Sequence, residues 1–214
     1  MPVNASKADT ESALRSMMKN FDAGSQFSTM ATVLLVYGTG EGQTAKIANR
    51  LEETLAQRGH NVTSMDVEAL PEGFSVAEFD AVLVGSSIHV SKHHSDIQEF
   101  IETHLDSLKA RPTAFFQVSL SSVSDDPERR AIAAEYVDSL LESTGWNPDR
   151  IALFGGALRY SKYGFLKRLL MKQIAKDAAG DVDTSRDYEY TDWEEVEAFA
   201  NDFAGFVEGR LDTE

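Results

Sequence analysis

The 214-residue chain contains no cysteine, which excludes disulfide bonds, a thiolate nucleophile and cysteine-ligated metals. It also lacks an apolar run long enough to cross a bilayer. Its first twenty residues are polar and lack the apolar core of a signal peptide. We therefore expect a cytoplasmic protein, and the length favours one α/β domain with additions.

Positive charge is also scarce, with 20 lysine and arginine residues against 35 aspartate and glutamate residues. The formal net charge of −15 argues against nucleic acid as a general partner. The deficit is uneven, because residues 159–176 contain six basic residues and no acidic one. That segment is +6, which leaves −21 on the remainder of a chain whose total is −15. The local reversal points to an anionic partner.

The stretch from Val33 to Arg50 organises the rest of the sequence. Residues 33–37 form an apolar, β-branched run typical of a parallel strand covered on both faces. A glycine-rich turn follows at 38–44, and a helical pattern then begins, with Ile47 and Leu51 on one face. This order places backbone N–H groups at a helix N-terminus, where they can bind a phosphate without a basic side chain.

Three kinds of phosphate loop are candidates for this turn. A nucleotide P-loop needs Lys-Ser/Thr after its last glycine, but the chain has Gln43-Thr44 there, which argues against ATP or GTP hydrolysis. The dinucleotide fingerprint G-x-G-x-x-G fails at Gln43, although Asp66 could serve as its ribose-binding acid, so an NAD site stays open. The flavodoxin loop Thr-x-x-Gly-x-Thr matches at every fixed position. A glycine turn without a ligand is the remaining alternative.

The flavodoxin loop predicts which residues hold the phosphate. The hydroxyl groups of two threonines and the N–H groups of residues 40–44 are the expected donors, and Glu41 must then point outward to avoid repulsion. The predicted phosphate-binding residues are Thr39, Gly40, Glu41, Gly42, Gln43 and Thr44.

Strand-like and helix-like segments alternate along the chain, which indicates a doubly wound parallel sheet. The expected strands are 33–37, 61–66, 79–85, 112–118 and 149–157. Five strands that alternate with helices suggest a flavodoxin-like α/β fold with strand order 2-1-3-4-5. The switch point of this order lies between strands one and three. We expect a flexible extension at 1–30, the domain at 31–210 and a basic helical insert at about 159–190. Thr191 and Glu194 are expected to form a capping box for the last helix.

The loops after strands three and four complete the predicted cofactor site. Small polar residues there can flank a planar ring, and the predicted contacts are Ser86, Ser87, Ile88, His89, Ser119, Leu120 and Ser121. Ordinary loop composition is the alternative interpretation. Three histidines at 89, 93 and 94 suggest zinc, but no carboxylate stands at a recognised ligand spacing, so we expect no metal. One of these histidines can still exchange a proton near a flavin or substrate.

The basic segment is the second informative stretch. Tyr163, Leu166 and Leu170 share one helical stripe, and lysine and arginine residues lie beside or opposite it. A basic amphipathic helix suits a membrane surface or an amphiphilic anion. The alternative is a helix that packs on its own domain and leaves a solvated basic face, and the sequence leaves both open.

Seven stretches together resemble the menaquinone-dependent protoporphyrinogen oxidase family, a group with the flavodoxin fold. They are Glu41–Thr44, Gly85–Ile88, His94–Phe100, Trp146–Arg150, Gly156–Tyr160, Asp183-Thr184 and Tyr190–Glu194. The resemblance spans residues 32 to about 206. It implies a bound FMN that oxidises protoporphyrinogen IX to protoporphyrin IX in two-electron steps and passes the electrons to a membrane quinone.

The resemblance also assigns a role to the insert. Its cations would pair with porphyrin propionates or lipid phosphates, and its aromatic residues would contact the macrocycle or the bilayer. The residues concerned are Arg159, Tyr160, Lys162, Tyr163, Lys167 and Arg168. Residues 159–176 would then hold the protein at the cytoplasmic face of a membrane. No side chain is assigned a catalytic role.

Two other functions compete with this one. A soluble flavodoxin-like electron carrier would use the acidic surface to dock to basic redox partners. Such carriers commonly sandwich the flavin between Trp and Tyr, and residues 86–94 and 119–125 contain no Trp, Tyr or Phe. A quinone reductase fed by NAD(P)H would need a nicotinamide site, and the sequence offers none that we can identify.

Overall fold

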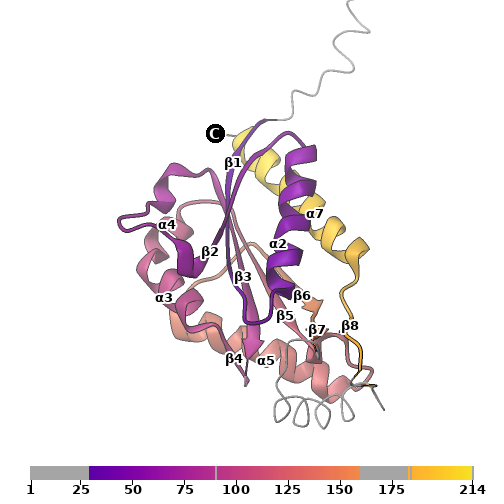
Figure 1. The fold of residues 1–214 in the computed structure, drawn as a ribbon. Helices are drawn as coiled ribbons and strands as arrows, with labels where there is room; N and C mark the ends of the chain where they lie inside the picture. Colours follow the sequence, from indigo (N-terminus) through magenta and orange to yellow (C-terminus); the bar gives the residue numbers. More distant parts are fainter. Residues whose placement is uncertain (1–28, 90, 160–182, 184, 214) are drawn as a thin grey trace, which may run out of the picture.

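The computed structural model describes residues 29–89, 91–159, 183 and 185–213. The described part is built on a parallel sheet with helices on both faces (Figure 1). Its parallel strands are β1 (Thr32–Gly38), β2 (Asn61–Asp66), β3 (Ala81–His89), β5 (Thr113–Ser119) and β6 (Arg150–Gly155). They lie in the order β2-β1-β3-β5-β6, which confirms the predicted order 2-1-3-4-5 and the flavodoxin-like topology.

Burial on both faces explains why residues 33–36 of strand β1 are all apolar. Val33 and Leu35 pack into one buried cluster with α2 (Gln43–Gln57) and α7 (Trp193–Leu211). Leu34 and Val36 point to the other face and join a second cluster. The helices of that second face are α3 (Ser95–Thr103), α4 (Leu105–Lys109) and α5 (Pro127–Thr144). Since a strand alternates its side chains between faces, a doubly covered strand has to be apolar throughout.

The segment after strand three differs from the prediction. A loop was expected from Ser86 onward, but β3 continues to His89 and forms a hairpin with β4 (Lys92–His93). Ser86 and Ser87 pair with Gln117 and Val118 of β5, so the sheet extends past the apolar run. The serines are therefore strand residues, because backbone pairing with the neighbouring strand continues where the hydrophobic pattern stops.

The last predicted strand divides into two parts. β6 ends at Gly155, and the N–H of Gly156 donates to the carbonyl of Ser119 at 3.1 Å. The chain then enters β7 (Ala157–Leu158), which pairs with β8 (Tyr188–Glu189) in a separate antiparallel sheet. The pair of strands β7 and β8 is called the β7–β8 hairpin below, although residues 159–187 separate the strands in the sequence. This hairpin lies at the same end of the molecule as the N-terminus of α2 (Figure 1). The helix predicted at 160–176 falls outside the described residues, as do residues 1–28 of the extension predicted at 1–30.

Helix α7 begins differently from the expected capping box. The N-cap is Asp192, whose carboxylate accepts from the N–H groups of Glu194 and Glu195 at 2.9 and 3.2 Å. Asp is a strong N-cap because its short side chain reaches those free donors. Thr191 is thereby free to bond elsewhere, and its hydroxyl donates to the carbonyl of Gly155 at 2.7 Å.

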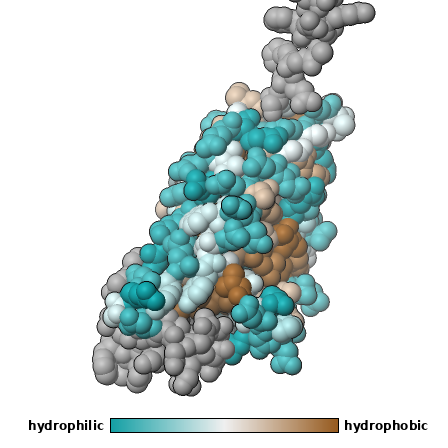
Figure 2. Space-filling view, turned by 90° about the vertical axis from the view of Figure 1, so that its right-hand side faces the viewer, coloured by the Kyte–Doolittle hydropathy of each residue, from teal (hydrophilic) through white to brown (hydrophobic). Residues whose placement is uncertain are grey.

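Figure 2 shows one face on which a hydrophobic area interrupts a largely hydrophilic surface. In the described ranges, no helix combines the length and apolar character that crossing a membrane requires.

The centre of the sheet yields a stability prediction. A Cβ built on Gly85 would lie only 2.0 Å from the ring of buried Phe116. Gly85→Ala should therefore lower the free energy of unfolding by about 3 kcal/mol, measured by urea denaturation. Gly205→Ala is the control, because it lies within α7 with nothing near its Cβ and should stabilise by about 0.5–1 kcal/mol. Equal stability of the two variants would contradict this packing.

Candidate functional site

The candidate site lies at the carboxyl ends of β1, β3 and β5, where the sheet reverses its winding order. The loop after β1 turns sharply into α2 through Gly42, whose φ of 92° is a conformation that favours glycine. The N–H of Gly42 donates to the hydroxyl of Thr39 at 3.0 Å, which closes the loop. The loop therefore ends at the N-terminus of α2, where the first helical N–H groups have no acceptor within the helix.

The loop fits a phosphate group. Thr44 is only 1% exposed, and its hydroxyl has no hydrogen-bond partner among the described residues. A buried hydroxyl without a partner is costly, and an anion at the helix N-terminus would satisfy it together with the free N–H groups. The loop itself, residues 38–44, contains no lysine or arginine. The first turn of α2 thus offers neutral donors for a dianion.

The end of β3 borders this loop. His89 lies beside Gly40, since a Cβ built there would be 3.5 Å from the imidazole. Ser86 is buried, and its hydroxyl accepts from the N–H of His94 at 3.0 Å. The hydroxyl of Ser87 donates to the carbonyl of Gly38 at 3.4 Å, so the two serines tie β3 to its neighbours. Ile88 pairs with His93 in the hairpin and contributes backbone at this edge.

The end of β5 is held by its own hydrogen bonds. The hydroxyl of Ser119 accepts from the N–H of Ser122 at 3.1 Å, and the two hydroxyl groups lie 2.7 Å apart. Leu120 and Ser121 follow directly, with Ser121 opening a short 3-10 turn. The predicted cofactor residues of β1, β3 and β5 therefore lie on adjacent strand ends of one sheet edge.

Gln43 and Arg159 occupy unexpected places. The Gln43 side chain points away from the loop: its Nε2 donates to Thr191 Oγ1 at 2.8 Å, and its Oε1 accepts from Arg159 Nη2 at 2.6 Å. Arg159 Nη2 also lies 3.5 Å from Glu189 Oε2, a carboxylate that Lys46 contacts at 2.9 Å. Partial burial would raise the pKa of Glu189, but the hydrogen bond and charge of Lys46 outweigh it and lower that pKa.

The other residues predicted to contact substrate or membrane lie outside the described residues. They are Tyr160, Lys162, Tyr163, Lys167 and Arg168. Their assignment stays a prediction. Arg159 is the described member of that group, and its contacts are with the chain itself.

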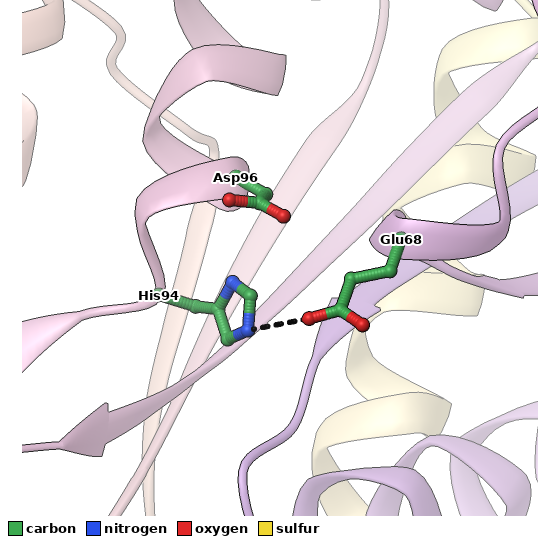
Figure 3. A group of neighbouring side chains, drawn as sticks. All are labelled: Glu68, His94 and Asp96. Atoms are coloured by element: carbon green, nitrogen blue, oxygen red, sulfur yellow. Dashed lines mark ion pairs between the residues drawn. The ribbon is translucent and has the colours of Figure 1, made fainter.

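Histidine and carboxylate side chains meet at the start of α3, a grouping that the sequence did not suggest. His94, Asp96 and Glu68 place one ligand atom each within 4.8 Å of one another, and His94 Nε2 lies 3.4 Å from Glu68 Oε1 (Figure 3). Glu68 comes from the turn after β2, so no local spacing could reveal it. The group sits at the positive end of a helix, which opposes a cation. The polar contact between His94 and Glu68 is enough to explain why these side chains meet.

The other two histidines differ from one another. His93 packs edge-on against Phe115, and its Nε2 lies 3.1 Å from the carbonyl of Tyr136. Burial lowers the pKa of His93 to about 4, so it is neutral near pH 7. His93 is therefore a packed residue, whereas the sequence suggested a loop residue. His89, in contrast, is exposed at the end of β3 and borders the phosphate loop.

A phosphate loop at this switch point, between the first and third strands of a 2-1-3-4-5 sheet, defines the class of flavodoxin-like proteins. The model of the flavodoxin domain matches residues 34–185. A flavodoxin from Pseudomonas aeruginosa, solved as a point mutant, aligns with a TM-score of 0.52 and 15% identity over 83% of this chain and 99% of its own. A short-chain flavodoxin associated with a bacterial microcompartment gives 0.52 and 13% over the same shares. These structures confirm the fold, and the domain indicates FMN as the cofactor.

Sequence relatives narrow the class. A protein of Escherichia coli K12 named protoporphyrinogen IX dehydrogenase [quinone] is 36% identical over 80% of this chain and 93% of its own length. A protein of the same name from Leishmania major is 32% identical over 80% of this chain and 74% of its own. The chain belongs to the protoporphyrinogen IX dehydrogenase family, which confirms the resemblance seen in the sequence.

The buried hydroxyl of Thr44 gives a binding prediction. Thr44→Val should raise the dissociation constant for FMN by about tenfold to a hundredfold, because a hydrogen bond to a charged group contributes about 1.5–3 kcal/mol. The measurement is quenching of flavin fluorescence, run in parallel with riboflavin, which has no phosphate and should be insensitive to the change. Thr54→Val is the control, since its hydroxyl on the same helix bonds the carbonyl of Arg50. An equal loss of affinity in both variants would contradict a phosphate contact at Thr44.

Proposed function

We propose that this protein binds FMN and uses it to oxidise protoporphyrinogen IX to protoporphyrin IX, with the electrons passed to a quinone. The observation that supports this most is the phosphate loop at the switch point, which has no lysine or arginine, in a chain that aligns with nearly the whole length of the E. coli relative. When bound, FMN supplies the two-electron redox chemistry. The protein binds the phosphate tail through residues 39–44 and orients the ring between the ends of β3 and β5.

The strand ends favour an enzyme over an electron carrier. Residues 86–94 and 119–125 contain no Trp, Tyr or Phe, so neither loop provides an indole, phenol or phenyl ring to stack on the flavin. Ser119 and Ser122 at the β5 end have small side chains, and their hydroxyl groups bond to each other. A flavin face bordered by small groups leaves room for a planar macrocycle. A carrier with no substrate of its own would gain nothing from that opening.

The cations of the insert have divided roles in this proposal. Arg159 is engaged by Gln43 and Glu189, so its contacts are within the chain. The remaining cations of the basic segment would meet propionates or lipid phosphates. They are Lys162, Lys167, Arg168, Lys172 and Lys176. Contact through 159–176 would hold the protein at the cytoplasmic face of a membrane, where a quinone is accessible.

Anaerobic mixing with protoporphyrinogen IX tests the activity. Because protoporphyrinogen IX loses its electrons in successive pairs and each FMN accepts one pair, the FMN-loaded protein is used in excess. We expect its yellow absorbance to bleach while porphyrin fluorescence appears, and added menaquinone should restore the yellow colour. Stable absorbance together with normal FMN binding would favour an electron carrier. A preparation that takes up no FMN would overturn both functions.

Charge reversal in the insert tests the membrane contact. Lys167→Glu with Arg168→Glu should weaken binding to phosphatidylglycerol vesicles by at least about tenfold, because each cation near an anionic surface contributes about 1 kcal/mol. Lys109→Glu with Arg210→Glu is the matched control, since it changes the total charge equally at exposed positions elsewhere. Equal effects of both pairs in a cosedimentation assay would attribute binding to total charge and exclude a specific contact.

A further inference from the structure

The backbone and the side chain of Gln43 belong to different parts of the molecule. Its backbone belongs to the phosphate loop, as the residue between Gly42 and Thr44 at the start of α2. Its side chain is almost fully buried and reaches the β7–β8 hairpin through two hydrogen bonds. Arg159 directly follows β7 and donates to Oε1 at 2.6 Å, while Thr191 lies just after β8 and accepts from Nε2 at 2.8 Å.

A second connection joins the same two elements one turn further along α2. Lys46 Nζ lies 2.9 Å from Glu189 Oε2 in β8, and Trp193 Nε1 donates to the other oxygen of that carboxylate at 3.2 Å. The base of the hairpin is fixed in turn to the main sheet. Thr191 donates to the carbonyl of Gly155, and a Cβ on Gly155 would lie 2.2 Å from the carbonyl oxygen of Tyr190. The hairpin base therefore cannot shift without moving these partners.

These contacts restrain the side chain of a residue in the first turn of α2. Two hydrogen bonds on a buried amide restrict its rotamer, and the rotamer of a first-turn residue restricts the path of the backbone around it. The N–H groups of Gln43 and Thr44 belong to that same turn. Breaking the amide contacts would leave buried polar groups unsatisfied and loosen the turn.

From this arrangement we propose that Gln43 is a positioning residue that couples the FMN phosphate loop to the β7–β8 hairpin. A correctly held hairpin tightens FMN binding, and bound FMN stabilises the hairpin by the same factor, as thermodynamic linkage requires. The inference rests on the proposed FMN cofactor. The strands β7 and β8 flank the basic insert in the sequence.

Variants on both sides of the bridge test the coupling. Gln43→Met keeps the volume and removes both hydrogen bonds, and it should raise the dissociation constant for FMN about tenfold. Arg159→Met changes only the hairpin side and should raise it about fivefold. The double variant should be no worse than Gln43→Met, because both changes break one bridge. Riboflavin binding should stay within about twofold of the wild type throughout, since riboflavin has no phosphate.

Arg150→Met is the matched control. Like Arg159→Met, this substitution removes the contacts of an arginine: an ion pair at 2.6 Å to Asp202 and a stacking contact over Phe206. Arg150, however, lies away from the hairpin. Its dissociation constant for FMN should stay within about twofold of the wild type. In hydrogen exchange, saturating FMN should slow the amides of Tyr188 and Glu189 in the wild type and in Arg150→Met. The same amides should respond less in Gln43→Met at equal saturation.

The outcomes separate this inference from the proposed cofactor. The coupling would be overturned if Arg159→Met left the affinity for FMN unchanged, or if FMN did not change the hydrogen exchange of β8 in the wild type. Either result would leave the proposed cofactor in place. Additive losses in the double variant would likewise overturn it. A wild-type protein that binds no FMN would instead overturn the proposed function itself.

Discussion

The proposed cofactor site depends on the N–H groups at the first turn of α2, which have no acceptor within the helix. Every neighbouring feature maintains that turn. Gly42 adopts a positive φ so that the chain can enter the helix, and Thr39 closes the loop through the N–H of Gly42. Gly38 cannot carry a side chain, because a Cβ there would lie 2.8 Å from His94 of the α3 layer. The turn is thus packed between two layers before any ligand arrives.

Local patterns were sufficient to predict the sheet and this loop. Val33–Val36 is apolar on both faces, a pattern that follows from burial alone, and the glycine and threonine spacing of residues 39–44 follows from the turn that a phosphate requires. Strand order then followed from the alternation of strands and helices. These features could be predicted because each is determined by residues close together in the sequence.

The remaining features depend on distant residues, and no local pattern signals them. Gln43 meets Arg159 and Thr191 across separations of 116 and 148 residues. Glu68 reaches His94 from the turn after another strand. The extension of β3 through Ser86–His89 depends on pairing with β5 and β4, which no hydrophobic pattern encodes. Arg159 contacts Gln43 and Glu189, partners that are visible only in three dimensions, and its predicted contact with substrate or membrane stays a prediction.

The positions of the cations explain how an acidic chain can hold a dianion. Lys46 and Arg159 lie near the loop, yet both contact Glu189, so neither has to be the partner of the phosphate. Binding through buried N–H and hydroxyl donors is screened far less by salt than binding through exposed charges. Positive charge is thereby left for the insert, where an amphiphilic acid or an anionic surface would need it. In the proposed function, separating a cofactor site of uncharged donors from a cationic segment would keep the two anions from competing for the same side chains, and the proposed Gln43 bridge would connect the two sites.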